Sequence, residues 1–186
     1  MKRLVQGGFK VKNQAALVFE AAGAVFIILL GSALHFTYAL SGSNPLVGFF
    51  SAVNESVWEH LKLAFWPAFG WMLLEVRPLK RLTNNFFTAK AVGAYLMVAF
   101  IPAVFYSYTV YVGESILSVD IATFVAAVFV GQFVSYQLFT RRSLPATAEK
   151  ASVIALFLLA AAFIVFTFYT PALQVFRDPV TGRYGV

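Results

Sequence analysis

The chain has 186 residues, of which 60% are hydrophobic and only 12% are charged. Soluble globular domains carry about 25% charged residues, so this composition excludes a water-soluble globule, a disordered chain and a collagen-like fibre. It predicts a single all-α, polytopic membrane domain over residues 1–186. The sequence contains no cysteine, which excludes disulfides, thiolate nucleophiles and cysteine-based metal sites.

Five apolar stretches are long enough for a transmembrane helix, which needs about 20 residues. In chain order they cover residues 15–40, 57–75, 91–112, 121–139 and 151–170. The first is too long for the apolar core of a signal peptide, so we interpret it as a retained helix. The second is interrupted by Glu59, His60 and Lys62. The remaining residues, 171–186, are rich in proline and glycine, which favours an irregular external tail.

The net charge of +6 is best explained as a topology signal. Basic residues precede the first stretch or lie in two of the four connections, whereas connections 41–56 and 113–120 contain none. The positive-inside rule therefore predicts a cytoplasmic N-terminus and, with five spans, an external C-terminus. Membrane lipids are the expected partners of this charge, and no nucleic acid is expected. The basic residues that decide the orientation are Lys2, Arg3, Lys10, Lys12, Arg77, Lys80, Arg81, Lys90, Arg141, Arg142 and Lys150.

Both histidines fall near the predicted external ends of the first two helices. His35 is about one turn from the outer end of the first, and His60 is about one turn inside the second. The short connection between these helices predicts that they are antiparallel neighbours. Asp120, at the start of the fourth helix, and Asp178, in the tail, are expected to reach the same vestibule.

The segment 54–62 is the densest in polar groups. If it is helical throughout, Glu55, Glu59 and Lys62 share one face at i, i+4, i+7, and Ser56 and His60 form an adjacent stripe. We expect Asn54 to be the N-cap of this helix. Glu59 and Lys62 are spaced to form an ion pair, which lowers the cost of holding either within a membrane. A purely structural role, capping and pinning the helix, accounts for several of these residues.

Imidazoles and carboxylates together suit a divalent metal, a proton relay or a general acid–base pair. The candidate ligand or proton site contains His35, Glu55, Ser56, Glu59, His60, Lys62, Asp120 and Asp178. Its candidate metal ligands are His35, Glu55, Glu59 and His60. The pattern is not HExxH, and no glycine-rich phosphate loop or nucleophile elbow is present.

Six runs of residues carry a family resemblance. They are Leu34-His-Phe-Thr-Tyr38, Ser41-Gly-Ser-Asn-Pro-Leu-Val-Gly48, Val53-Asn-Glu-Ser-Val-Trp-Glu-His-Leu-Lys-Leu63, Phe105-Tyr-Ser-Tyr-Thr109, Val119-Asp-Ile121 and the tail Phe176-Arg-Asp-Pro-Val-Thr-Gly-Arg-Tyr-Gly185. The sequence resembles a prokaryotic family of multi-spanning membrane proteins that is known only as a domain of unknown function. The resemblance implies a prokaryotic plasma-membrane location and covers nearly the whole chain. It implies no activity.

Three functions fit these features. The first is a non-enzymatic protein that binds or translocates a small solute, a metal ion or a proton at the external polar site. The second is an intramembrane, metal-assisted hydrolase acting on a lipid-like substrate, and the third is a structural or assembly protein. Five helices are few for a transporter built of inverted repeats, so transport favours a homo-oligomer. We also hypothesise that the tail folds back over the external mouth, with Asp178 or Tyr184 as a ligand or lid.

Overall fold

The computed structural model describes the fold of residues 2–186 and the side chains of residues 14–186. This part of the chain is all-helical, which confirms the predicted fold class, and its only extended pairing is one isolated bridge between Arg177 and Tyr184. In chain order the helices are α1 (Lys2–Leu40), α2 (Pro45–Gly48), α3 (Val57–Leu79), α4 (Phe86–Val112), α5 (Leu117–Thr140), α6 (Ala146–Phe168) and the 3-10 helix η1 (Gln174–Phe176).

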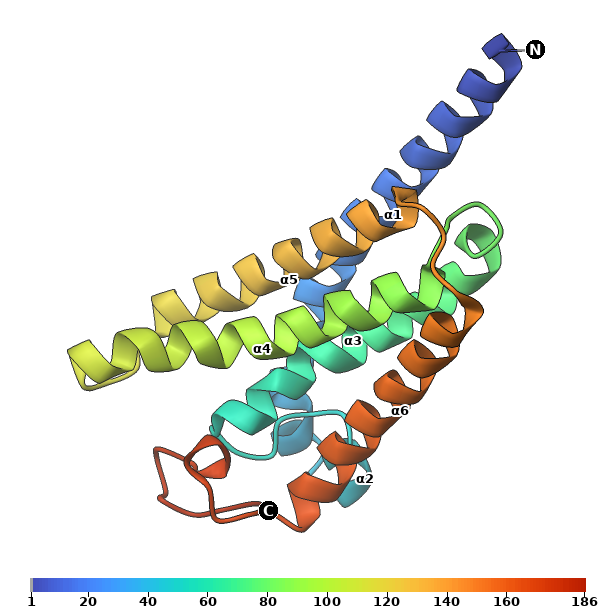
Figure 1. The fold of residues 1–186 in the computed structure, drawn as a ribbon. Helices are drawn as coiled ribbons and strands as arrows, with labels where there is room; N and C mark the ends of the chain where they lie inside the picture. Colours follow the sequence, from blue (N-terminus) through green and yellow to red (C-terminus); the bar gives the residue numbers. More distant parts are fainter. Residues whose placement is uncertain (1) are drawn as a thin grey trace.

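Helix α3 is the central element of the bundle. It packs against α1, α4, α6 and η1, while α1 also packs on α5 and α6 also packs on α4 (Figure 1). Helices α4 and α5 form a long antiparallel hairpin, and the C-terminal tail lies beside the first turn of α3 (Figure 1). Any group on the inward face of α3 therefore meets side chains from several other helices.

Glycines bring two of these helix pairs into close contact. A Cβ added to Gly93 of α4 would lie 2.8 Å from the Gly131 carbonyl oxygen of α5. A Cβ added to Gly31 of α1 would lie 2.4 Å from the Leu63 carbonyl oxygen of α3. Small residues at helix crossings let backbones approach in this way, and they are typical of packing between membrane helices.

Four helices are long and apolar enough to cross a membrane: α1 from Gln14 onward, α4, α5 and α6. Helix α3 has 23 residues, which is sufficient length, but its ionisable residues leave it less apolar than the other four. Large apolar side chains such as Leu29, Phe133 and Leu158 are more than half exposed. Apolar groups on this scale at the surface are expected where lipid is the solvent.

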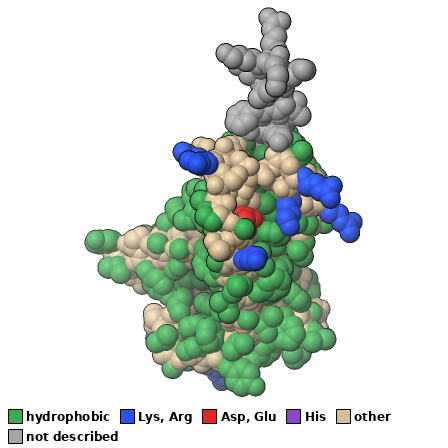
Figure 2. Space-filling view, turned by 45° about the vertical axis from the view of Figure 1, so that its right-hand side comes forward, with side chains coloured by type: hydrophobic (Ala, Val, Ile, Leu, Met, Phe, Trp, Pro, Cys, Tyr) green, Lys and Arg blue, Asp and Glu red, His purple; other side chains and the backbone are tan. Residues whose placement is uncertain are grey.

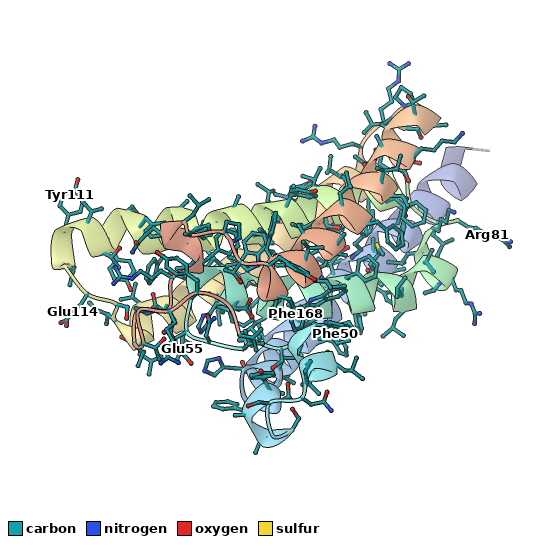
Figure 3. All side chains as sticks on the ribbon, turned by 90° about the horizontal axis from the view of Figure 1, so that it is seen from below. Phe50, Glu55, Arg81, Tyr111, Glu114 and Phe168 are labelled. Atoms are coloured by element: carbon teal, nitrogen blue, oxygen red, sulfur yellow. The ribbon has the colours of Figure 1, made fainter. Side chains whose placement is uncertain are left out.

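Basic side chains gather at one end of the bundle, which we call the inner end after the predicted orientation, and we call the opposite end the outer end. Apolar side chains cover most of the face in Figure 2, and Lys and Arg side chains gather near one end of it. Arg81 lies at one end of the bundle, whereas Glu55, Tyr111 and Glu114 lie at the other (Figure 3). The predicted orientation also depends on four residues whose side chains are outside the described ones: Lys2, Arg3, Lys10 and Lys12.

The helix bounds differ from the predicted stretches mainly at the inner ends. Helix α4 begins at Phe86 rather than at residue 91, so Lys90 lies inside the helix and is only 6% exposed. Its assignment to an inner connection was wrong. Helix α4 begins earlier than predicted because of a tertiary contact. The Glu149 carboxylate accepts hydrogen bonds from the Phe87 and Thr88 backbone N–H groups, at 2.9 and 3.2 Å. This carboxylate caps α4 from another helix, which sequence spacing alone does not reveal.

Candidate functional site

The loop before α3 is joined to α1 one turn from His35. The buried Ser51 hydroxyl accepts a hydrogen bond from the Tyr38 backbone N–H, at 3.0 Å, and donates to the Leu34 carbonyl. These two backbone groups would pair with each other in a regular α-helix, so the hydroxyl inserts into the hydrogen-bond ladder of α1. The insertion fixes the loop against the outer end of α1.

The start of α3 differs from the prediction. Ser56 is the N-cap, and its hydroxyl accepts from the Glu59 backbone N–H at 3.4 Å. Asn54, the predicted N-cap, instead forms a local turn in which its Oδ1 accepts from the Ser56 N–H at 2.9 Å. Glu55 therefore lies outside the helix, and the predicted face shared by Glu55, Glu59 and Lys62 does not exist. The turn chemistry of Asn54 competes with capping, as it often does for this residue type.

His35, Glu55 and His60 come together at the outer ends of α1 and α3. One ligand atom from each lies within 4.8 Å of the other two. Glu55 Oε1 is 3.9 Å from His35 Nε2, and Glu55 Oε2 is 3.4 Å from His60 Nε2. The three side chains are 30%, 50% and 35% exposed in the same order, so the cluster is open to solvent on one side. We call these three residues the outer cluster.

Hydrogen bonding fixes the orientation of His60. Its Nδ1 lies 2.9 Å from the Ser56 carbonyl oxygen, which can only accept, so Nδ1 carries a proton. In the neutral ring, Nε2 then presents a lone pair toward the Glu55 carboxylate. Two acceptors facing each other need a cation between them, either a proton on Nε2 or a metal ion. With the proton on Nε2, the hydrogen bond from His60 and the charge of the nearby imidazoles hold the pKa of Glu55 below its usual value of 4.5, despite partial burial.

Glu59 and Lys62 form a separate, buried group, as their spacing predicted. Lys62 Nζ lies 2.5 Å from Glu59 Oε2, and the two side chains are 0% and 2% exposed, respectively. Lys62 also donates to the Gly48 carbonyl and to the Thr167 hydroxyl, at 2.7 and 3.0 Å. Glu59 accepts from the Val53 N–H and the Thr167 hydroxyl, at 3.0 and 2.9 Å. Glu59 is thus fully engaged and lies outside the outer cluster.

The two aspartates proposed for the vestibule also lie outside the outer cluster. Asp120 accepts a hydrogen bond from the Tyr108 hydroxyl at 2.6 Å, which joins the outer ends of α4 and α5. Asp178 accepts from the Val180 N–H and the Thr181 hydroxyl within its own turn, at 2.9 and 2.6 Å. Each carboxylate is hydrogen-bonded locally, and neither belongs to the group of three donors at the outer ends of α1 and α3.

The C-terminal tail packs against the segment that carries the outer cluster. The Asn54 side-chain amide donates to the Gly185 carbonyl at 2.8 Å. Trp58 lies against Phe176 of η1 and Phe163 of α6, each with a centroid separation of 4.8 Å. The tail therefore supports the loop from outside, whereas Tyr184 pairs with Arg177 inside the tail.

A second buried polar group, which the sequence reading did not bring together, lies at the inner ends of the helices. Lys90 Nζ lies 2.6 Å from Glu20 Oε1 and also contacts Glu75 Oε2. Ser135 donates to Glu20 Oε1 at 3.0 Å. All four residues are at most 6% exposed. In the sequence, the three ionisable residues of this group lie within or beside apolar stretches. No pattern in the sequence indicates that these residues, from three different helices, contact one another.

The chain belongs to a family of unknown function, DUF6512, whose model matches residues 10–186. Comparisons with curated proteins and with solved structures gave no match. Family membership agrees with the resemblance drawn from the sequence and supplies no activity.

Proposed function

We propose that this protein is an integral membrane protein that binds a divalent metal ion at the outer ends of α1 and α3. His35, Glu55 and His60 would be the protein ligands. The observation that carries the proposal is the convergence of these three donor groups, from two helices and a loop, within 4.8 Å of one another. Mixed imidazole and carboxylate donors suit zinc and related transition metals.

The distances in the outer cluster are close to those of a bound metal. Tetrahedral zinc with bonds of about 2.1 Å places its ligand atoms about 3.4 Å apart. The two contacts of Glu55 with the imidazoles are 3.4 and 3.9 Å. The bond from His60 Nδ1 to the Ser56 carbonyl is the kind of supporting contact that orients a ligating histidine. Little movement is needed to bring all three donors onto one ion.

Binding is better supported than translocation. The layer between α1, α3 and α5 beneath the outer cluster is filled by buried apolar side chains, including Ala24, Ile27, Ala64 and Ala127, each at most 2% exposed. Gly31 brings α1 against the α3 backbone at the same level. A water-filled path for an ion would have to separate these helices. A metal that enters from the solvent side would therefore stay there, and a homo-oligomer is not required.

We also propose that α3 is the fifth span and that the N-terminus faces the cytoplasm of a prokaryotic cell. The five-span arrangement places the basic end of the bundle inside and the outer cluster outside. The buried pairing of Glu59 with Lys62 supports this assignment, because it removes two isolated charges from the length of α3. The run 53–63, which supplies Glu55 and His60, would then be the signature of the family.

A metal-assisted hydrolase is the second candidate. Three protein ligands leave one position of a tetrahedron open, which is the arrangement of catalytic zinc. The exposed side of the outer cluster would admit water or the headgroup of a lipid-like substrate. Metal-dependent release of product from a lipid ester would favour this candidate over simple binding.

Metal titration of the purified protein in detergent tests the proposal. Cobalt is a suitable probe, because its visible absorption reports tetrahedral coordination by nitrogen and oxygen. We expect one equivalent to bind to the wild type, and binding to be lost in His60→Ala and in the double variant His35→Ala/His60→Ala. Asp120→Asn is the matched control, because Asp120 lies outside the cluster, and it should bind normally. Equal binding by all four proteins, or none by any, would overturn the proposal.

The orientation has its own test. Tags placed at the two termini should differ in their accessibility to a membrane-impermeant reagent in intact cells. The C-terminal tag should react and the N-terminal tag should be protected. Reaction or protection of both tags together would show an even number of spans and would exclude α3 as a crossing helix.

A further inference from the structure

The second buried polar group differs from the outer ion pair in its balance of charge. Glu59 and Lys62 are one carboxylate and one ammonium, which cancel. At the inner end, two carboxylates, Glu20 and Glu75, share the single ammonium of Lys90. With every group ionised, this inner group carries one net negative charge. An uncompensated charge in a low-dielectric, membrane-embedded site is too costly to persist.

Among the described side chains, no further charged group forms an ion pair with these three residues. Glu20 comes from α1, Glu75 from α3 and Lys90 from α4. Helix α5 contributes only neutral groups: the Ser135 hydroxyl donates to Glu20 Oε1, and the Gln132 amide donates to the Glu20 backbone carbonyl at 3.1 Å. The Phe139 ring of α5 lies 5.2 Å from Lys90 Nζ. The charge must therefore be balanced by something that binds at the carboxylates themselves.

Two carboxylate oxygens are free to bind the cation that balances this charge. Glu20 Oε2 and Glu75 Oε1 are buried and have no hydrogen-bond partner, although their side chains are only 3% and 0% exposed. Buried polar atoms are nearly always paired, so two such oxygens within one group indicate a missing cation. A proton needs no cavity of its own, and both carboxylates contact the same Lys90 ammonium.

We propose that Glu20, Glu75 and Lys90 form a proton-binding site in which the two carboxyls share one exchangeable proton at neutral pH. The site holds a protonated carboxyl, a carboxylate and the ammonium of Lys90, which sum to zero charge. It lies near the inner face: Lys90 and Glu75 are each four residues from the inner end of their helix, about 6 Å at 1.5 Å per residue. The proton therefore exchanges with the inner aqueous phase.

Infrared spectroscopy of the full-length protein in detergent at neutral pH tests the proposal, because it counts protonated carboxyl groups. A protonated carboxyl has a C=O stretch above the amide I band, and this stretch shifts in D2O if the proton exchanges. The wild type should show one such carboxyl. Glu20→Gln or Glu75→Gln leaves a neutral carboxylate–ammonium pair and should abolish the band while keeping the fold. Lys90→Met removes the cation and should roughly double the band, because both carboxyls must then be protonated.

Glu114→Gln is the matched control, since it removes an exposed carboxylate at the opposite end of the bundle and should leave the band unchanged. Absence of the band in the wild type, or its persistence in both single glutamine variants, would overturn the proposal. A band that is missing in sodium buffer and arises when sodium is replaced by a large organic cation would assign the site to a metal cation instead. The glutamine variants and Lys90→Met change the carboxyl band in opposite directions. The proposal can therefore still be tested if one of these variants folds poorly.

Discussion

His60 Nε2 and Glu55 Oε2 lie 3.4 Å apart, and the other ring nitrogen of His60, Nδ1, donates to the Ser56 carbonyl at 2.9 Å. Glu55 is outside α3, whereas His60 lies in its first turn. The contact therefore joins the loop to the helix, and a change in the charge of either group changes both this contact and the ligand properties of the outer cluster. It also makes the acid stability of the protein depend on one carboxylate.

Protonation of Glu55 should make the protein less stable in acid. Its pKa in the folded protein is below 4.5, chiefly because His60 hydrogen-bonds to the carboxylate. A lowered folded-state pKa contributes stability above pH 4.5, and this contribution is lost as the pH falls through the folded-state value. Because the side chain is half exposed, the contribution is about 0.2–1 kcal/mol. Thermal unfolding in detergent as a function of pH should show this loss in the wild type and not in Glu55→Gln, with exposed Glu114→Gln behaving as the wild type.

Gly31→Ala should destabilise the protein, whereas Gly70→Ala should not. The new Cβ at Gly31 would lie 2.4 Å from the Leu63 carbonyl oxygen, and backbone cannot yield as a side chain can. Such overpacking costs about 1–3 kcal/mol. Gly70, in α3, has no atom within 4 Å of the added Cβ, so alanine there should be neutral or stabilising by up to about 1 kcal/mol. Melting temperatures of the two variants provide the comparison, and equal values would mean that α1 and α3 do not meet at Gly31.

The Glu59–Lys62 pair should show strong coupling. Breaking a buried pair by removing one partner costs about 3–5 kcal/mol, because a buried charge is left alone. Both single variants, Glu59→Gln and Lys62→Met, should therefore be strongly destabilised. The double variant should recover much of the loss, since no charge remains. Chemical unfolding of the four proteins completes the cycle, and additive losses would show that the two side chains do not interact.

The tail should contribute to stability in two steps. Deleting the residues after Phe176 removes the hydrogen bond from Asn54 to the Gly185 carbonyl, which is worth about 1 kcal/mol. Deleting the residues after Thr170 also removes Phe176, which is 5% exposed and lies against Trp58, and costs about 3 kcal/mol more. Thermal unfolding of the two truncated proteins should give successively lower midpoints. Midpoints equal to that of the full chain would show that the tail does not pack on α3.

The sequence correctly indicated some local contacts and misplaced others. The Glu59–Lys62 pair followed from i, i+3 spacing and is present. The predicted N-cap, Asn54, was wrong because Ser56 was equally suited and the tail supplies a partner for Asn54. Lys90 was placed in a connection because its charge interrupted an apolar pattern, yet α4 includes it. A charged residue at the end of an apolar stretch is ambiguous until its partners are known.

By itself, the sequence determined the fold class and the apolar helices, because burial in lipid constrains every residue of a span and leaves its mark on composition and length. It also placed both histidines near the same end of adjacent helices. Only the tertiary structure decided which ionisable groups meet. It joined Glu55 to both histidines, kept Glu59 with Lys62, and gathered Glu20, Glu75 and Lys90 from three helices. The reason is physical: periodicity fixes the face and depth of a side chain on its own helix, whereas contacts between helices depend on how those helices pack and rotate against one another.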